Sequence, residues 1–158
     1  MQIKLRAATP EDEAFLYKLY AGTRAEELAA WGWDDAQQQL FLQLQFRGRQ
    51  AHYAQYPNPD HRIILDEELP IGRLLVSRLE KEIRLVDIAL LPEHRGRGIG
   101  AKLIQELLHE AARSGKVVRL HVEKFNRAQQ LYGRLGFEIA GDAQTHYLME
   151  WKSPTGEN

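Results

Sequence analysis

The segment that most constrains the fold is a glycine-rich loop that runs directly into an amphipathic helix. The loop, residues 95–100, reads RGRGIG, with a glycine at every second position. Apolar residues then recur on one helical face until Gly115 ends the pattern: Ile99, Leu103, Ile104, Leu107, Leu108 and Ala111. The first N–H groups of a helix lack intrahelical acceptors, and glycines allow close approach to the backbone. The segment therefore predicts a site that binds a pyrophosphate.

Two common phosphate-binding loops do not fit this segment. The chain has no GKS or GKT sequence to hold a nucleoside triphosphate with its magnesium, and the glycine spacing is not the GxGxxG of a dinucleotide-binding fold. Arg95 and Arg97 add positive charge that suits phosphate, although a guanidinium can instead be solvated or paired with a carboxylate. A tight strand-to-helix turn without a ligand is the structural alternative.

Length and composition exclude several other classes of function. The 158 residues suit a single domain over 1–158, in which folding buries roughly two-thirds of the unfolded surface. A formal net charge of −1 offers no general attraction to nucleic acid or anionic lipid, so we expect neither as a partner. Without cysteine, and with no HExxH pair among the histidines, we expect no metal. No apolar run suits a signal or membrane helix, so the expected location is cytoplasmic.

The rest of the chain predicts an α+β order of elements. Strands are expected at 3–6, 62–65, 71–79, 83–91, 117–122, 137–140 and 146–151, and helices from Thr9, over 34–56, over 99–114 and over 128–135. The second, third and fourth strands are separated by short charged turns and are therefore expected to be antiparallel neighbours. Residues 152–158 are expected to form a frayed tail.

A second motif lies at residues 126–137, which read NRAQQLYGRLGF. This segment resembles the N-x-x-A-x-x-L-Y-x-x-x-G-F motif of the GNAT superfamily of N-acetyltransferases. The first motif of that family, Q/R-x-x-G-x-G/A after a V-x-P-like turn, is similar to Leu90-Leu91-Pro92 followed by Arg95-x-x-Gly98-x-Gly100. The two motifs stand in the family's order. One departure is that Asn126 lies one residue closer to Ala128 than the family pattern has it.

The resemblance extends over residues 2–151 and implies both a fold and an activity. The implied fold is the mixed α/β GNAT, or acyl-CoA N-acyltransferase, fold: a twisted mixed sheet of about seven strands with about four helices on its two faces. Two parallel strands, at 83–91 and 117–122, are expected to splay apart and admit the cofactor. The implied activity is acetyl-CoA-dependent transfer of an acetyl group to a primary amine of a small molecule or protein, by direct attack on the thioester. The alternative is a non-catalytic module that binds acyl-CoA or another protein. Homodimers are common in the family, so the resemblance leaves both a monomer and a homodimer open.

The resemblance also implies which residues bind acetyl-CoA (CoA). The backbone of residues 88–90 would pair with the pantetheine arm like an added strand, the amides of the loop would hold the pyrophosphate, and Asn126 would contact the arm. The expected cofactor-binding residues are Ile88, Ala89, Leu90, Arg95, Gly96, Arg97, Gly98, Ile99, Gly100, Ala101 and Asn126.

Tyr132 is implied to lie near the thioester sulfur, where it could act as general acid. A phenol with a pKa of about 10 can protonate a thiolate whose thiol has a pKa of about 8.5 if the two are held in contact. The alternative is that Tyr132 simply packs with Leu131 and Leu135 along one side of a helix.

The general base is expected on the strand that precedes Asn126. The position where the family often has a glutamate holds His121, whose imidazole, with a pKa of about 6.5, can accept a proton at neutral pH. Glu123 on the same face and Asp87 on the preceding strand are competitors, either as bases through a water or as partners that orient His121. A purely structural role for His121 is equally open.

An aromatic set falls where the family builds its acceptor pocket, in and between the first helices. Aromatic residues at helical spacing are also typical of a core, so both interpretations are kept. The set comprises Trp31, Trp33, Phe41, Phe46, Tyr53 and Tyr56.

Overall fold

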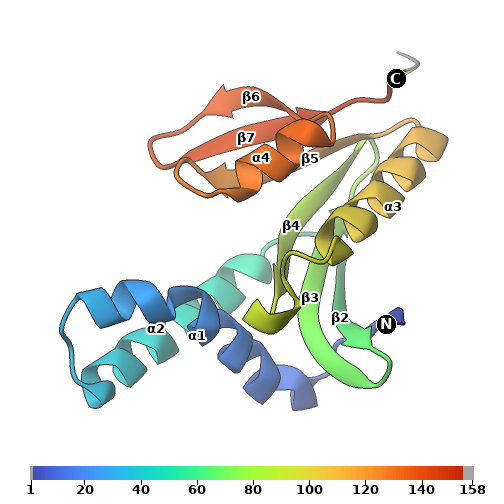
Figure 1. Ribbon diagram of the computed structural model, residues 1–158. Helices are drawn as coiled ribbons and strands as arrows, with labels where there is room; N and C mark the ends of the chain where they lie inside the picture. The colour runs from blue at the N-terminus through green and yellow to red at the C-terminus, as the bar shows by residue number, and fades with distance from the viewer. Residues whose placement is uncertain (1, 155–158) are drawn as a thin grey trace.

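The computed structural model describes residues 2–154, without the side chain of residue 26. In this range the chain forms a seven-stranded mixed sheet with α-helices on both faces (Figure 1). The strands are β1 (Ile3–Ala7), β2 (Pro59–Asp66), β3 (Leu69–Arg78), β4 (Glu82–Leu90), β5 (Val117–Glu123), β6 (Glu138–Asp142) and β7 (His146–Trp151). The helices are α1 (Glu13–Ala30), α2 (Asp35–Tyr53), α3 (Ile99–Ser114) and α4 (Ala128–Arg134), with the 3-10 helices η1 (Pro10–Asp12) and η2 (Pro92–His94). The predicted fold class is confirmed.

The predicted tail does not begin where the sequence suggested. Ser153 is buried, so the chain stays packed for at least two residues beyond β7. The other end of that prediction, residues 155–158, lies outside the described residues.

The strands run in the order β1-β2-β3-β4-β5-β7-β6. The predicted antiparallel pairing of β2, β3 and β4 is confirmed. β4 and β5 pair in parallel, but the pairing covers only residues 82–84 against 117–119. Beyond Arg84 the two strands diverge like the arms of a V (Figure 1). The predicted splay is therefore present, and it divides the sheet between β4 and β5.

A β-bulge in β4 lies just beyond this point. Leu75 stands opposite Asp87 and Val76 opposite Leu85, which leaves Val86 as an extra residue. A bulge bends its strand and breaks the alternation of side chains. Val86 and Asp87 consequently both line hollows on the side of α1 and α2.

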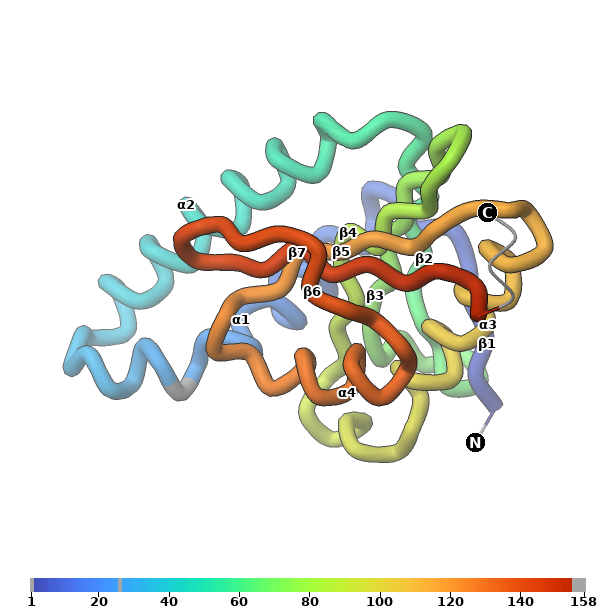
Figure 2. The backbone as a smooth tube through the Cα atoms, turned by 90° about the horizontal axis from the view of Figure 1, so that it is seen from above, coloured from blue at the N-terminus to red at the C-terminus, as the bar shows by residue number. Residues whose placement is uncertain are grey.

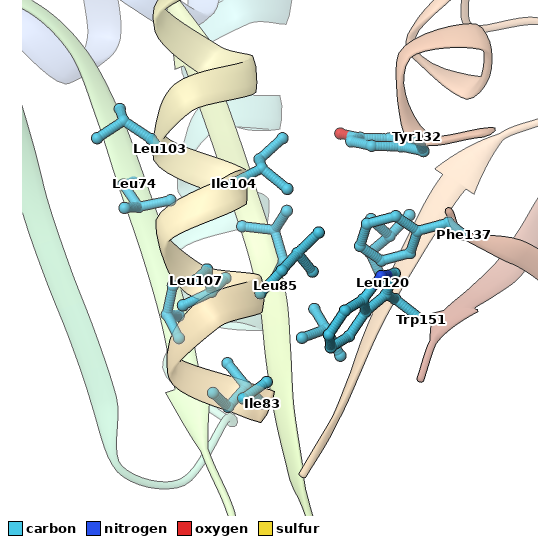
Figure 3. Packing of buried hydrophobic residues seen from close by; sticks show 14 of the residues in the cluster. Leu74, Ile83, Leu85, Leu103, Ile104, Leu107, Leu120, Tyr132, Phe137 and Trp151 are labelled. Atoms are coloured by element: carbon cyan, nitrogen blue, oxygen red, sulfur yellow. The ribbon is translucent and has the colours of Figure 1, made fainter. Parts of the chain in front are cut away.

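The sheet separates two hydrophobic clusters. The larger cluster joins α3 and α4 to the sheet, and the smaller one joins α1 and α2 to it. β2 contributes to both by alternation, with Ile64 in the larger cluster and Ile63 and Leu65 in the smaller. Seen from above, α2 and α4 lie on opposite sides of the sheet (Figure 2). Figure 3 shows side chains of α3 facing β3 and β4, with Leu120, Phe137 and Trp151 of the C-terminal half beside them.

Polar side chains mark where the first two helices begin. The predicted start at Thr9 forms the 3-10 turn η1, in which Asp12 accepts the N–H of Thr9 at 2.8 Å before α1 begins. Arg6 holds the same carboxylate with two hydrogen bonds, of 2.9 and 2.8 Å. At α2, Asp34 and Gln37 exchange side-chain and backbone hydrogen bonds in a capping box.

Gly72 lies where the backbone of β3 closely approaches that of β4. A Cβ at this position would overlap the carbonyl oxygen of Ala89 and lie 2.8 Å from Cδ2 of Leu90. We expect Gly72→Ala to lower the free energy of unfolding by about 1–3 kcal/mol, measured by urea denaturation. Gly22, inside α1, has no such neighbour within 4 Å, so Gly22→Ala should raise the same quantity by up to about 1 kcal/mol. Equal stability of the Gly72→Ala variant and the wild type would contradict the close approach.

Candidate active site

The glycine-rich loop joins η2 to α3 and faces open space. Gly96 and Gly98 have φ angles of 75° and 79°, a left-handed conformation that strains any residue with a Cβ. A Cβ built on either glycine would meet no atom within 4 Å. These glycines are therefore required by the backbone conformation, and the loop leaves room for a ligand beside it.

The N-terminus of α3 has no cap. No side chain accepts its first N–H groups, and its first internal hydrogen bond runs from Lys102 N–H to the carbonyl of Gly98, at 3.0 Å. Within residues 2–154 the N–H groups of Ile99, Gly100 and Ala101 therefore have no hydrogen-bond acceptor. In a helix of 16 residues, these groups also carry the positive end of the helix dipole. The arrangement suits an anion such as a pyrophosphate.

The two arginines of the loop have different surroundings. Arg95 donates from Nε to the carbonyl oxygen of Leu90, at 3.0 Å, and so ties the loop to the end of β4. Arg97 is exposed and forms no ion pair with any residue that the structure describes. Arg95 therefore positions the loop, whereas the guanidinium of Arg97 is available to a phosphate.

The open edge of β4 lies next to this loop. Leu91 donates its N–H to the carbonyl of Ile71 on the β3 side, at 2.8 Å. Because backbone groups alternate along a strand, the N–H groups of Leu90 and Ile88 point to the opposite edge, where β5 does not pair. The side chains of Ile88 and Leu90 pack against the larger core. The part of these residues left open to a ligand is their backbone, and Ala89 stands between them.

Asn126 stands at the start of α4. Its Oδ1 accepts the N–H of Ala128 at 2.8 Å, a local bond that helps to start a helix. The side-chain nitrogen has no partner among the described residues. Asn126 thus has a structural role already, and Nδ2 is the group that remains for a ligand.

Tyr132 on α4 is buried in the larger core, with its ring 5.7 Å from that of Phe137. Its hydroxyl points toward α3 in Figure 3 and has no hydrogen-bond partner among residues 2–154. Burial, and then the negative charge of Asp87, raise the pKa of Tyr132 to about 12. The ring is therefore core, as the structural interpretation had it, while the hydroxyl stays protonated and free to donate.

His121 lies on the exposed face of β5, because Val118, Leu120 and Val122 alternate with it into the core. Nη1 of Arg84 on β4 lies 3.2 Å from Nδ1 of His121. A guanidinium can only donate, so Nδ1 is the acceptor and the neutral ring carries its proton on Nε2. Burial, and then the charge of Arg84, lower the pKa of His121. His121 is thus neutral at pH 7, but its lone pair is occupied.

The two carboxylates named with His121 are also placed differently. Glu123 is exposed, lines the same cleft as His121 and forms no ion pair with a described residue. Asp87 lies on the far side of the bulge, with Oδ2 3.7 Å from Nε of Arg73. The structure therefore brings His121 and Glu123 together and leaves Glu123 as the carboxylate without a cationic partner.

A cleft of about 950 Å³ lies between α2 and the strands β4, β5 and β7. Phe41, Tyr53 and Tyr56 line it from the side of α2, and His121, Glu123 and His146 line it from the sheet. A smaller hollow of about 60 Å³, bounded by Asp87 and Ala89, shares Tyr20, Arg49 and Tyr53 with it.

The predicted aromatic set is divided by the structure. Phe46 is buried and bounds the smaller hollow. Trp31 and Trp33 pack edge-on against each other and against Phe41 at the turn between α1 and α2, and neither tryptophan lines the cleft. The set is therefore partly core and partly cleft wall.

The sequence profile of the Acetyltransferase (GNAT) family matches residues 15–137, well over half of the chain. This chain belongs to the GNAT family. Uncharacterised N-acetyltransferases of Mycobacterium tuberculosis and Mycobacterium bovis are 33% identical to it over 97 residues, which cover 58% of this chain and 62% of theirs. The match thus spans less than two thirds of the length of these curated relatives.

Solved structures show the same GNAT fold. The PaiA N-acetyltransferase from Thermoplasma acidophilum, in complex with coenzyme A, superposes with a TM-score of 0.72 at 18% identity, over 97% of this chain and 100% of that one. An acetyltransferase from Thermus thermophilus gives 0.71 at 17% identity, over 97% and 98%. At these identities the likeness concerns the fold.

Several residues of the GNAT cleft were missed at the level of sequence. Arg49, Arg84, His52 and His146 all line it, and none stands in a family motif. The signal that could have found two of them is the spacing of Gln45, Arg49 and His52 along one face of α2.

Among residues 2–154 no group of three or more His, Asp or Glu side chains is placed to hold a metal ion. No helix in this range combines the length and the apolar character that crossing a bilayer demands.

The contact between Arg84 and His121 predicts a pKa change. Removing the positive charge with Arg84→Gln should raise the pKa of His121 toward about 6.5, measured by NMR titration of the imidazole protons. His121→Gln identifies the resonance. Arg113→Gln, which removes a charge from the exposed last turn of α3, should leave it unchanged. Equal shifts in the two arginine variants would show that Arg84 is not the cause.

Proposed function

We propose that this GNAT chain is an acetyl-CoA-dependent N-acetyltransferase that acetylates a primary amine of a small molecule or peptide. In the reaction an N–C bond forms, the C–S bond breaks, one proton leaves the amine and the products are an amide and a free thiol. Three features carry the proposal: the uncapped start of α3, the open edge of β4, and the hydroxyl of Tyr132, which points toward α3 (Figure 3). Membership of the family and the coenzyme A complex of the Thermoplasma protein support it.

The residues present fit the cofactor. The N–H groups of residues 96–101 and the guanidinium of Arg97 suit the pyrophosphate, because they lie at an uncapped helix start with open space beside the loop. The backbone edge of residues 88–90 suits an extended chain with amide groups, which would pair with it as a strand does. Nδ2 of Asn126 is a further donor on the opposite side of the splay. When bound, acetyl-CoA supplies the acetyl thioester and the thiol leaving group.

Tyr132 stabilises the leaving group in this mechanism. Its pKa of about 12 keeps the hydroxyl protonated throughout the neutral range. Because this pKa lies above that of a thiol, about 8.5, the hydroxyl acts mainly as a hydrogen-bond donor to the departing sulfur, with proton transfer completed from solvent. In the proposed mechanism the N–H of Leu90, on the open edge of β4, would donate to the oxygen of the acetyl group as negative charge develops there.

Glu123 is our first choice for the group that removes the proton from the amine, directly or through a water. It lines the cleft and is free of ion pairs within the described residues. His121 can take this role only when Arg84 releases its Nδ1, and Asp87 is engaged with Arg73.

The non-catalytic alternative has a specific observation in its favour. Oδ1 of Asn126 and Nδ1 of His121 are both occupied by bonds within the chain, which suits a module that binds acyl-CoA without turnover. Release of free thiol from acetyl-CoA in the presence of amines distinguishes the two functions.

Thermal unfolding with acetyl-CoA tests the cofactor site. A ligand at 100 times its Kd stabilises the fold by about 2.7 kcal/mol, which should raise the Tm by about 5–10 °C, whereas ATP and NAD should not. Gly98→Ala should abolish the shift because the loop loses its left-handed turn. Gly115→Ala is a matched control, since Gly115 has a φ of 67° at the other end of α3; it should lower the Tm but keep the shift. If acetyl-CoA does not raise the Tm of the wild-type protein, the proposal is refuted.

Substitution of Tyr132 tests the mechanism. Tyr132→Phe keeps the ring and removes a hydroxyl that bonds to no described residue, so the Tm and the acetyl-CoA affinity should stay close to those of the wild type. The turnover number should fall by about 100-fold or more. Tyr147→Phe removes a hydroxyl from the neighbouring strand β7 and should leave turnover unchanged. Full activity of the Tyr132→Phe enzyme would exclude this residue from the chemistry.

A further inference from the structure

Arg49 on α2 has no carboxylate in ion-pair contact among the described residues, and the negative charge of Asp87 acts on it only from across the smaller hollow. It lines both the cleft and the smaller hollow. Its Nε donates to the hydroxyl of Tyr53 at 3.1 Å, and its Cζ lies 5.4 Å from the ring centroid of Tyr20 and 5.8 Å from that of Tyr53. No ion pair joins it to any residue within 2–154. The guanidinium is therefore held against two tyrosine rings while its terminal N–H groups lack a carboxylate partner.

The other arginines around the two hollows are neutralised. Arg73 has Asp87 at 3.7 Å, and Arg84 has Glu82 at 3.1 Å. Tyr53 does not neutralise Arg49, because burial, and then the charge of Asp87, raise the pKa of this phenol and keep it protonated. Among the described residues that line the cleft, Glu123 is the one carboxylate, and Arg49 is the guanidinium that lacks an ion-pair partner.

The wall around Arg49 is largely aromatic. Tyr20, Phe41 and Tyr56 line the cleft with the exposed side chain of Leu44. The cleft, at about 950 Å³, has the size of a small-molecule site. A guanidinium offers a planar fork that matches a carboxylate, and stacking on rings reduces the entropy lost when the fork binds.

We propose that Arg49 binds the carboxylate of the acceptor, so that the substrate is a small amino acid-like molecule with an amine to be acetylated and an apolar or aromatic side chain. The acetylation of its amine rests on the function proposed above, whereas the carboxylate site is a property of the cleft itself. Glu123 lines the same cleft as Arg49, and the opposite charges of the two side chains suit a molecule with an ammonium group and a carboxylate.

Binding of matched ligand pairs tests the carboxylate site without turnover. The probes are N-acetyl-glycine, N-acetyl-L-leucine and N-acetyl-L-phenylalanine, each compared with its carboxamide by calorimetry. The wild type should bind at least one acid about tenfold more tightly than its amide, which corresponds to about 1.4 kcal/mol. Arg49→Gln should remove this difference. Arg47→Gln, on an exposed position of the same helix outside both hollows, should preserve it.

Three results would overturn the proposal. They are equal binding of acids and amides by the wild type, a preference for acids that persists in Arg49→Gln, and no binding of any acid in the series.

Thiol release separates this inference from the proposed function. If thiol is released from acetyl-CoA with the same kcat/KM for L-phenylalanine and for its amide, the transferase function stands. The proposal that the acceptor carries a carboxylate is then refuted. The opposite result is a protein that binds acids through Arg49, whose Tm acetyl-CoA does not raise and which releases no thiol with any amine. That result would refute the transferase function and leave the carboxylate site standing.

Discussion

The early end of the parallel pairing between β4 and β5 is the constraint on which the site depends. Hydrogen bonds join the strands over only three residue pairs, and beyond them the backbone groups on one edge of β4 lack a strand partner. Unpaired backbone groups are costly when buried, so such an edge must meet water or a ligand. The bulge at Val86 bends β4 at this point, and the uncapped start of α3 lies at its far end. The binding edge and the anion site are therefore consequences of one interruption in the sheet.

Much of the fold could be predicted because its signals are local. The face of α3, the glycines around it and the β-rich runs define elements whose ends lie within a few residues of those expected. The inward face of α2 could not be read in the same way. Leu40 and Leu44 share its helical pattern but are exposed, whereas Leu42 is buried. Since α2 packs on one side and borders a cleft on the other, its apolar residues do not all belong to a core.

The candidate site divides along the same line. The loop amides could be predicted because consecutive residues supply them. The pairing of Arg84 with His121 depends on the parallel register, and the position of Asp87 depends on a bulge in the register of β3 and β4. Each register depends on how two separate segments of the chain pair, so neither can be predicted from one segment alone. Arg49 was missed for a related reason, because the sequence around an arginine on a helix does not show that the rings of Tyr20 and Tyr53 lie against its guanidinium.

The splay also has a mechanical meaning. With so few hydrogen bonds between them, β1–β4 and β5–β7 are held together mainly by side chains, those of Leu120, Phe137 and Trp151 against the residues of α3. Side-chain packing permits small rotations more readily than a hydrogen-bonded ladder does. We therefore expect small relative rotations of the two halves of the sheet to occur at the seam between β4 and β5. An extended chain that bonded to both β4 and β5 in that seam would complete the ladder and stiffen the connection between the two halves.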